Sequence, residues 1–264
     1  MRLSGIVTYC SLADIASRNL AKYLGLETKP GRYETPYGYH VCVEGEFLYL
    51  PDVYEEFPII FLSRHESASR YPALTVHATG NFGEAPYGGY PDKISISFPR
   101  LAGTLLKYLF ELAPEGYHVN YEVTHHGPLV ESPHVFIEIG SSETERNDKN
   151  AIEAVGEAVG RVLRELEVMD LVSAVGVGGP HYAPTFTRIT REEPIGFGHI
   201  IPKRAMKGEP RVDRLKMAIE RTRPKAELVV LDRKGMSGKR RQTFRRRLQN
   251  AIENENMSLK RERR

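Results

Sequence analysis

Apolar runs of strand length recur along this chain of 264 residues, and segments with helical spacing separate several of them. Short, mainly apolar runs predict strands buried on both faces, and such strands in alternation with helices are typical of an α/β protein. The predicted strands are residues 3–9, 59–62, 74–76, 120–124, 135–139, 171–177 and 228–231. We therefore expect an α/β fold with a mainly parallel or mixed central sheet that is flanked by helices.

Three helices are expected between these strands. Ser11 is followed three residues later by Asp14, which resembles a capping box, and Gly25 ends the helix that begins there. Residues 100–112 and 149–166 carry apolar side chains at helical spacing and predict two longer helices.

A hairpin is expected between the first helix and the strand at residues 59–62. Residues 39–43 and 47–50 are short apolar runs on either side of a Glu-Gly-Glu segment. Two such runs joined by a turn segment predict a β-hairpin. The chain shows no internal repeat.

Cys10 and Cys42 are the two cysteines, and both have apolar neighbours. We expect two buried thiols, because so few cysteines exclude a disulfide framework and fit a reducing compartment. The sequence has no run of about 18 apolar residues, which a membrane span requires. Its first residues indicate a strand and not a secretory signal. The chain is therefore expected in the cytoplasm, without membrane association.

Positive charge is concentrated at the end of the chain. Residues 233–264 contain 12 Lys and Arg and 3 Asp and Glu, a net charge of +9, whereas the whole chain carries +3. Phe244, Leu248 and Ile252 are four residues apart, which favours a helix with one docked edge. We therefore divide the chain into a catalytic α/β domain, residues 1–232, and a basic helical tail. Such a tail favours a polyanion such as nucleic acid as partner, because its cations displace counterions from phosphates. A solvated, solubilising helix is the alternative.

Polar residues directly follow five of the predicted strands. These segments contain the candidate site residues, which are Arg64, His65, His77, Thr79, Asn81, Thr124, His125, His126, Glu138, Gly178, Gly179 and His181. Ligands of open α/β sheets bind beyond the carboxyl ends of the strands. We therefore expect these residues to gather around one cleft.

Histidine dominates this set. Imidazole exchanges protons near neutral pH and is also the commonest neutral metal ligand. The group can act as general acid and base, or it can hold a Zn²⁺ ion, and no His-Glu-x-x-His spacing decides between the two. The candidate metal ligands are His65, His77, His125, His126, Glu138 and His181. Because His125 and His126 are adjacent, only one of them would face the site if both lie on a strand.

Two glycine-containing segments, residues 79–83 and 176–180, are candidates for binding a phosphate or an oxyanion through backbone N–H groups. Tight turns are the other explanation for these glycines. Arg64 stands beside His65, and it favours either a contact with a phosphate or carboxylate or an ordinary salt bridge.

Taken together and in order, these segments resemble the archaeal and plant type of D-aminoacyl-tRNA deacylase. The matching residues are 63–65, 77–81, 124–128, 138–141, 178–184 and 198–200, and the similarity continues through 232–235. The resemblance implies hydrolysis of the ester that joins a D-amino acid to the terminal ribose of tRNA, a chiral proofreading of mischarged tRNA. It also implies a zinc requirement and a fold related to peptidyl-tRNA hydrolases and nucleoside phosphorylases.

Under this hypothesis a water, activated by a histidine or by bound zinc, attacks the aminoacyl carbonyl. We favour His125 or His126 for this role, with His77 and His181 nearby and Glu138 orienting a histidine or completing a metal shell. The residues expected to bind substrate are Arg64, His65, Thr79, Asn81, Thr124, Gly178 and Gly179. The partner is tRNA charged with a D-amino acid, and no stable protein partner is expected.

Two alternatives remain open on the sequence alone. One is another hydrolase on the same architecture, such as a peptidyl-tRNA hydrolase or a zinc peptidase. The other is a noncatalytic RNA-binding protein whose histidines are structural. The lack of an aromatic-rich RNA-recognition motif disfavours this second alternative.

Overall fold

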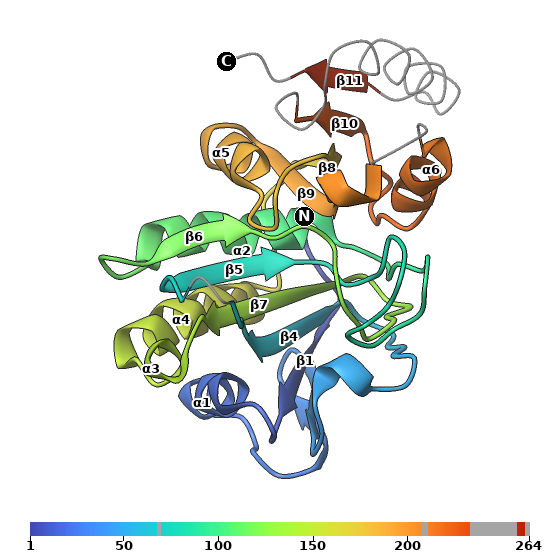
Figure 1. Cartoon of the computed structure of the whole chain (residues 1–264). Helices are drawn as coiled ribbons and strands as arrows, with labels where there is room; N and C mark the ends of the chain where they lie inside the picture. The colour runs from blue at the N-terminus through green and yellow to red at the C-terminus, as the bar shows by residue number, and fades with distance from the viewer. Residues whose placement is uncertain (68–69, 207–210, 233–257, 262–264) are drawn as a thin grey trace.

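Seven strands form the larger of two sheets, in the order β2-β3-β1-β4-β7-β5-β6 (Figure 1). They are β1 (Ile6–Ser11), β2 (Gly31–Thr35), β3 (Gly38–Val43), β4 (Ile59–Arg64), β5 (Ala73–His77), β6 (His118–Tyr121) and β7 (His134–Gly140). The computed structural model describes residues 1–67, 70–206, 211–232 and 258–261. β2 and β3 are antiparallel, as are β5 and β7, and the other neighbours are parallel. The predicted mixed α/β fold is confirmed.

Helices pack against one face of this sheet. They are α1 (Ile15–Tyr23), α2 (Pro99–Leu112), α3 (Glu143–Arg146) and α4 (Lys149–Glu165). Alternation along β7 separates the two faces, because Ile137 and Ile139 belong to the core shared with the helices, whereas Phe136 packs in a separate apolar group. Glu138 follows Phe136 by two residues, so its carboxylate lies on the face away from the helices.

The smaller sheet is entirely parallel and has the order β11-β10-β8-β9. Its elements are β8 (Val172–Val177), α5 (Pro184–Glu192), β9 (Ile195–Ile201), the 3₁₀ turn η2 (Lys203–Met206), α6 (Val212–Glu220), β10 (Leu228–Leu231) and β11 (Ser258–Arg261). Helix α2 contacts β9 as well as β5, and therefore joins the two sheets (Figure 1).

Strand β9 is not among the predicted strands, and its glycines explain why. A Cβ at Gly196 would lie 2.3 Å from the carbonyl oxygen of Pro99, and one at Gly198 would lie 2.3 Å from Ser97 Oγ. The close approach of α2 thus requires glycine in a buried strand, where this residue weakens the usual strand pattern. Helices α5 and α6 are likewise absent from the sequence predictions.

The start of α1 differs from the predicted capping box. Asp14, not Ser11, is the N-cap, and its side chain accepts a hydrogen bond from the backbone N–H of Ser17 at 3.2 Å. Ser11 ends β1, and its hydroxyl donates to the carbonyl of Gly45 at 2.8 Å. The serine therefore fixes the loop that returns from β3 and is not available to the helix.

The predicted hairpin is wrong in its second strand. β3 pairs with β2, and residues Phe47–Tyr49 form the 3₁₀ turn η1. Phe47 packs against Phe61 and Phe136, with ring centroids 5.2 and 5.9 Å apart. Packing of this ring over the open face of the sheet, rather than strand pairing, decides the local conformation.

The last described residues of the chain, Ser258–Arg261, form β11 beside β10. The helix predicted from Phe244, Leu248 and Ile252 lies outside the described residues, and the division of the chain at residue 232 stays a prediction. Among the described residues, no helix combines the length and apolar character that a membrane crossing needs.

Candidate active site and metal-binding groups

Three neighbouring strands bring the functional side chains to the face of the larger sheet that the helices leave open. Glu138 on β7 pairs in register with Ser63 of β4 and with Thr75 of β5. Side chains directly opposite each other share a face of the sheet. Because β5 runs antiparallel to β7, its last residue, His77, lies opposite Phe136 and not at the end of β7. The site is therefore a cluster over the sheet face and not a row at the carboxyl edge that we expected.

His77, His125 and His126 form the first cluster. Their ring centroids are 4.3 to 4.8 Å apart, and one nitrogen from each lies within 4.8 Å of the others. The expectation that only one of His125 and His126 faces the site depended on both lying on a strand, and neither does. They follow the end of β6, and His126 has a φ of +44° in the left-handed region, which turns its ring back towards His125.

The Nδ1 atoms of these three histidines are all occupied by nearby carbonyl oxygens. The Nδ1 of His125 donates to Val123 at 2.8 Å, that of His126 to Gly127 at 2.6 Å, and that of His77 to Ala78 at 3.3 Å. Such bonds fix the tautomer and leave each Nε2 as an acceptor, which is the usual arrangement of metal-binding histidines.

His77 gives the clearest sign that the cluster accommodates a cation. Its Nε2 is buried and has no hydrogen-bond partner among the described residues. The nearest carboxylate oxygen, Glu138 Oε1, is 3.6 Å away. A buried polar atom without a partner is costly, and a metal ion bound by the three Nε2 atoms would remove that cost.

A second group adjoins the first and is centred on Glu122. Its Oε1 is 2.9 Å from His65 Nδ1, and its Oε2 is 2.7 Å from His181 Nε2 and 3.5 Å from His125 Nε2. Glu122 has a fully buried side chain, whereas that of His181 is 40% exposed. The candidate residues from the sequence do not include Glu122, although a carboxylate next to a buried strand is a signal of a paired or metal-binding group.

The two carboxylates stay ionised despite their burial. Burial alone would raise the pKa of Glu122, but contacts with His181 and His65 lower it well below its ordinary value. For Glu138 burial is likewise outweighed, by the charge of His77 and the contact with His65, and its pKa is lowered. In return, Glu122 and Glu138 overcome the desolvation of His65 and raise the pKa of this imidazole to about 11.

Within the first cluster, the pKa is lowered for two imidazoles and raised for the third. Burial and the neighbouring imidazoles lower the pKa of His125 far below its ordinary value, and they lower that of His126 to about 4. Both rings are therefore neutral at pH 7, which is the form that binds metals. Burial also lowers the pKa of His77, but the charge of Glu138 outweighs it and raises the pKa.

A cavity of about 400 Å³ opens onto both groups. Both apolar and charged side chains line it. The apolar ones are Phe47, Leu48 and Phe136, Tyr87 lies beside them, and the charged ones are Asp14, Glu46, Arg64, Glu66 and Glu138. Arg64 forms ion pairs with Glu46 at 3.0 Å and Glu66 at 3.7 Å, so its side chain makes the salt bridges that were one of the two expectations for it.

Three side chains that were predicted to bind substrate make polar contacts with other residues of the protein. Thr79 Oγ1 donates to the carbonyl of Pro128 at 2.9 Å, and Asn81 Nδ2 donates to that of Gly88 at 3.0 Å. Thr124 Oγ1 is 3.1 Å from a ring nitrogen of His199. These buried side chains brace the segment that carries His125 and His126. Their contact with substrate stays a prediction.

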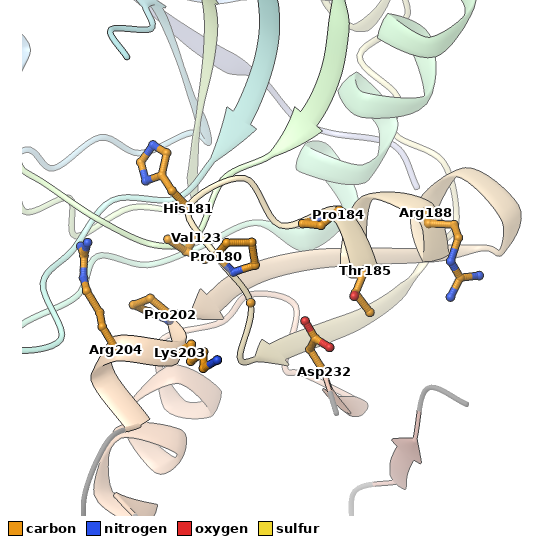
Figure 2. A pocket seen from close by; sticks show the side chains of 11 residues that line it. Val123, Pro180, His181, Pro184, Thr185, Arg188, Pro202, Lys203, Arg204 and Asp232 are labelled. Atoms are coloured by element: carbon orange, nitrogen blue, oxygen red, sulfur yellow. The ribbon is translucent and has the colours of Figure 1, made fainter. Parts of the chain in front are cut away.

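Gly179 lines a second, larger cavity of about 800 Å³, which Figure 2 shows from close by, and Gly178 precedes it in the chain. Both adopt a positive φ, of 104° and 94°. The N–H of Gly178 donates to the carbonyl of Ile201 at 2.9 Å, so it is not available for an oxyanion. Gly179 lines the cavity together with His181, which lines the smaller cavity as well.

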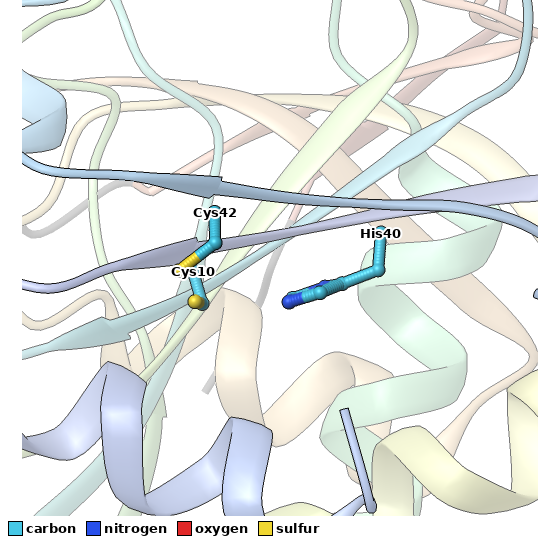
Figure 3. A group of neighbouring side chains, drawn as sticks. All are labelled: Cys10, His40 and Cys42. Atoms are coloured by element: carbon cyan, nitrogen blue, oxygen red, sulfur yellow. The ribbon is translucent and has the colours of Figure 1, made fainter. Parts of the chain in front are cut away.

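Cys10, His40 and Cys42 form a third group that has the composition of a metal site (Figure 3). It lies within the helix-covered core, away from the histidine clusters. Both ring nitrogens of His40 are engaged, with Thr8 Oγ1 and with the carbonyl of Glu27, each at 2.9 Å. Burial and the neighbouring Cys42 raise the pKa of the Cys10 thiol. We interpret this group as two buried free thiols, as expected, beside a satisfied core histidine.

Comparison with known proteins identifies the fold and its family. Residues 54–259 match the sequence model of the family described as D-aminoacyl-tRNA deacylase. The chain is 42% identical to the D-aminoacyl-tRNA deacylase of Pyrococcus furiosus over 70% of this chain and 67% of that protein. Identity to the enzyme of the same name from Pyrococcus abyssi is 40%, over 76% and 71% of the two chains.

A solved crystal structure, described as a conserved protein of unknown function, superposes with a TM-score of 0.84. The two chains are 28% identical, and the match covers 99% of this chain and 96% of the other. The histidine clusters over the sheet face thus stand in a fold shared along nearly the whole chain. On these matches, the chain belongs to the D-aminoacyl-tRNA deacylase family.

Proposed function

We propose that this chain hydrolyses the ester bond of D-aminoacyl-tRNA and so releases a free D-amino acid and tRNA. Membership of the deacylase family supports the reaction. The observation that carries it is the pair of buried histidine and carboxylate groups that meet at the wall of a cavity, which the half-exposed His181 also lines.

Zinc is the metal we propose for the cluster of His77, His125 and His126. One ring nitrogen of each histidine lies within 4.8 Å of the others, and each Nδ1 is held by a backbone carbonyl, which leaves Nε2 as the nitrogen available to a metal. Three histidines are a common ligand set of catalytic zinc. Held by His77, His125 and His126, zinc would supply Lewis acidity, which lowers the pKa of water to about 7 and polarises a carbonyl oxygen. Glu138 and Glu122 supply negative charge beside this cluster, which favours a divalent cation.

His181 is the group that we propose to handle the proton. Its Nε2 lies 2.7 Å from the buried carboxylate of Glu122, and the tautomer protonated at Nε2 leaves Nδ1 to accept a proton. The oxygen of a water molecule bonds to the aminoacyl carbonyl carbon, while His181 takes a proton from that water. The bond from that carbon to the ribose oxygen then breaks, and the ribose oxygen receives the proton from His181.

Chiral selection would arise in the smaller cavity. Its acidic residues attract the α-ammonium group, and its apolar wall at Phe47 and Phe136 accommodates the side chain. With both groups fixed, the configuration at the α-carbon decides whether the ester carbonyl reaches His181. The basic tail is proposed to contact the tRNA backbone, as its charge suggests.

The assay that tests this function compares four substrates with the purified chain. D-tyrosyl-tRNA should release tyrosine at least about 100-fold faster than L-tyrosyl-tRNA, the order of discrimination that a binding pocket gives. Peptidyl-tRNA and short peptides should not be cleaved. Preferential cleavage of either would instead favour a peptidyl-tRNA hydrolase or a zinc peptidase, and tight tRNA binding without turnover, with or without added zinc, would favour a noncatalytic RNA-binding protein.

Alanine substitution tests the site itself. Each of the changes His77→Ala, His125→Ala, His126→Ala and Glu138→Ala should lower the release of D-tyrosine by 100-fold or more, since general acid–base and metal catalysis each contribute at least about that factor. Wild-type rates in all four variants would mean that the reaction occurs elsewhere.

A cytoplasmic location stays a prediction.

A further inference from the structure

One residue, His181, lines both cavities. The side chain lines both the smaller cavity over the sheet face and the larger cavity beside η2. A substrate atom that reacts at His181 can therefore extend into each cavity from a single point. Figure 2 shows the imidazole at one end of the larger cavity, with Pro180 and Val123 beneath it.

The two cavities differ in charge. Acids predominate in the smaller one, where Arg64 is already paired with Glu46 and Glu66. In the larger one the cations are Arg188, Lys203 and Arg204, and the acid is Asp232. Arg188 pairs with Glu192 at 2.6 Å, whereas Lys203 and Arg204 form no ion pair with any described residue.

Lys203 and Arg204 belong to a segment whose backbone is hydrogen-bonded at Lys203 and at Ala205. The backbone N–H of Lys203 donates to the carbonyl of Gly179 at 3.1 Å. The next residue but one, Ala205, is buried and accepts a hydrogen bond from Arg214 Nη1 at 2.6 Å. The two side chains thus project from an anchored turn into a cavity whose opposite wall carries the reacting imidazole.

A cavity with unpaired cations selects an anionic occupant, and an aminoacyl-tRNA supplies one on the correct side of its ester. The aminoacyl group lies on one side of the carbonyl, and the terminal ribose with its phosphodiester chain lies on the other. Cations attract the phosphates, whereas the acids of the smaller cavity repel them and attract an α-ammonium group. A volume of about 800 Å³ lies within the usual range of ligand pockets.

We propose that the larger cavity is the subsite for the 3′-terminal nucleotide of the tRNA, with Lys203 and Arg204 neutralising the adjacent phosphates. This inference rests on the proposed function and assigns a direction to the substrate. The D-aminoacyl group enters the smaller cavity, the ester lies at His181, and the terminal nucleotide lies between Gly179 and η2.

The test uses the full chain with the double substitution Lys203→Gln and Arg204→Gln. Steady-state hydrolysis of D-tyrosyl-tRNA should show KM raised about 10-fold or more with kcat within about twofold, because phosphate contacts contribute binding and not chemistry. The dependence of log(kcat/KM) on log salt between about 50 and 200 mM should also become shallower by about one to two units.

Two controls keep this test specific. Lys149→Gln removes an exposed lysine that lines neither cavity, and it should leave KM and the salt dependence unchanged. D-tyrosyl-adenosine has the same ester but no phosphate, and the double variant should cleave it with the kcat/KM of the unmodified chain.

A double variant with the KM and salt dependence of the unmodified chain would overturn the assignment of the cavity. Equal loss with D-tyrosyl-adenosine would overturn it too, because the substitutions would then act on the reaction centre. If the unmodified chain releases no tyrosine from D-tyrosyl-tRNA, the proposed function itself fails. The two failures are therefore distinguishable.

Discussion

Glu122 Oε2 lies 2.7 Å from His181 Nε2, and the side chain of the acid is fully buried whereas that of the histidine is 40% exposed. A buried carboxylate that holds an accessible imidazole is the arrangement of a general base and its orienting partner. Because His181 also lines both cavities, this contact would join substrate position to proton transfer in the proposed reaction.

Replacement of Glu122 should therefore affect turnover more than binding. Glu122→Gln keeps the shape of the side chain but removes its charge, and we expect kcat for D-tyrosyl-tRNA to fall by about 100-fold while KM changes by less than about threefold. Glu122→Asp should retain more activity than the glutamine variant. Glu143→Gln, at an exposed position of α3, serves as control, and an unchanged kcat in Glu122→Gln would exclude the proposed pair.

Metal content should distinguish the histidine cluster, which is proposed to bind zinc, from the group of Cys10, His40 and Cys42, which is not. His77→Ala, His125→Ala and His126→Ala should each lose zinc, measured per chain by elemental analysis after dialysis, because loss of one of three ligands removes a large part of the affinity. Cys42→Ala should keep the zinc content of the unmodified chain, since the neighbouring His40 is already hydrogen-bonded at both nitrogens. Circular dichroism checks that all variants are folded. Loss of zinc in the cysteine variant alone would reverse this assignment.

Gly88 should be intolerant of a side chain. It has a φ of +76°, and a Cβ there would lie 1.7 Å from the carbonyl oxygen of Leu48. Gly116 has a similar φ of +87° but open space around it. In urea unfolding at pH 7, Gly116→Ala should cost about 1–2 kcal/mol for the left-handed backbone, and Gly88→Ala should cost at least about 2 kcal/mol more because backbone must move. Equal costs would mean that the loop adapts without strain.

His199 should make the fold sensitive to acid. It is fully buried, and burial lowers its pKa from 6.5 to about 4. The unfolded chain therefore binds a proton more readily between these values, and stability falls as pH decreases, by about 1.4 kcal/mol per pH unit from this residue.

Urea unfolding at pH 6.5, 5.5 and 4.5 measures this dependence. His199→Asn should flatten it, whereas His118→Asn, at an exposed position of β6, should not. An unchanged slope in the His199 variant would assign acid sensitivity to other buried groups.

Much of the architecture could be predicted because periodicity is a local property. The runs that became β4, β5, β7, β8 and β10 are apolar and short, and α4 has a continuous apolar stripe. β9 could not be predicted in this way. Its glycines are required by the close approach of α2, which is a contact between residues about 100 positions apart in the chain. The direction of β5 relative to β7 is likewise a tertiary property, and it moved the site from the strand ends to the sheet face.

The candidate site shows the same limit at the level of single residues. The positions of His77, His125 and His181 after strands indicated that they would meet, and they do. The placement of His126 depended on one left-handed φ, which no periodicity reveals. Glu122 was treated as part of a strand, although its contacts with His65 and His181 make it the centre of the second group.

The carbonyls that hold Nδ1 of His77, His125 and His126 belong to residues at most two positions away in the chain. Each ring is thus oriented by its own short stretch of backbone and not by whatever its outer nitrogen binds. It follows that withdrawal of the metal by a chelator should yield an inactive protein that remains folded, and that adding zinc back should restore activity within mixing time, without a slow refolding phase.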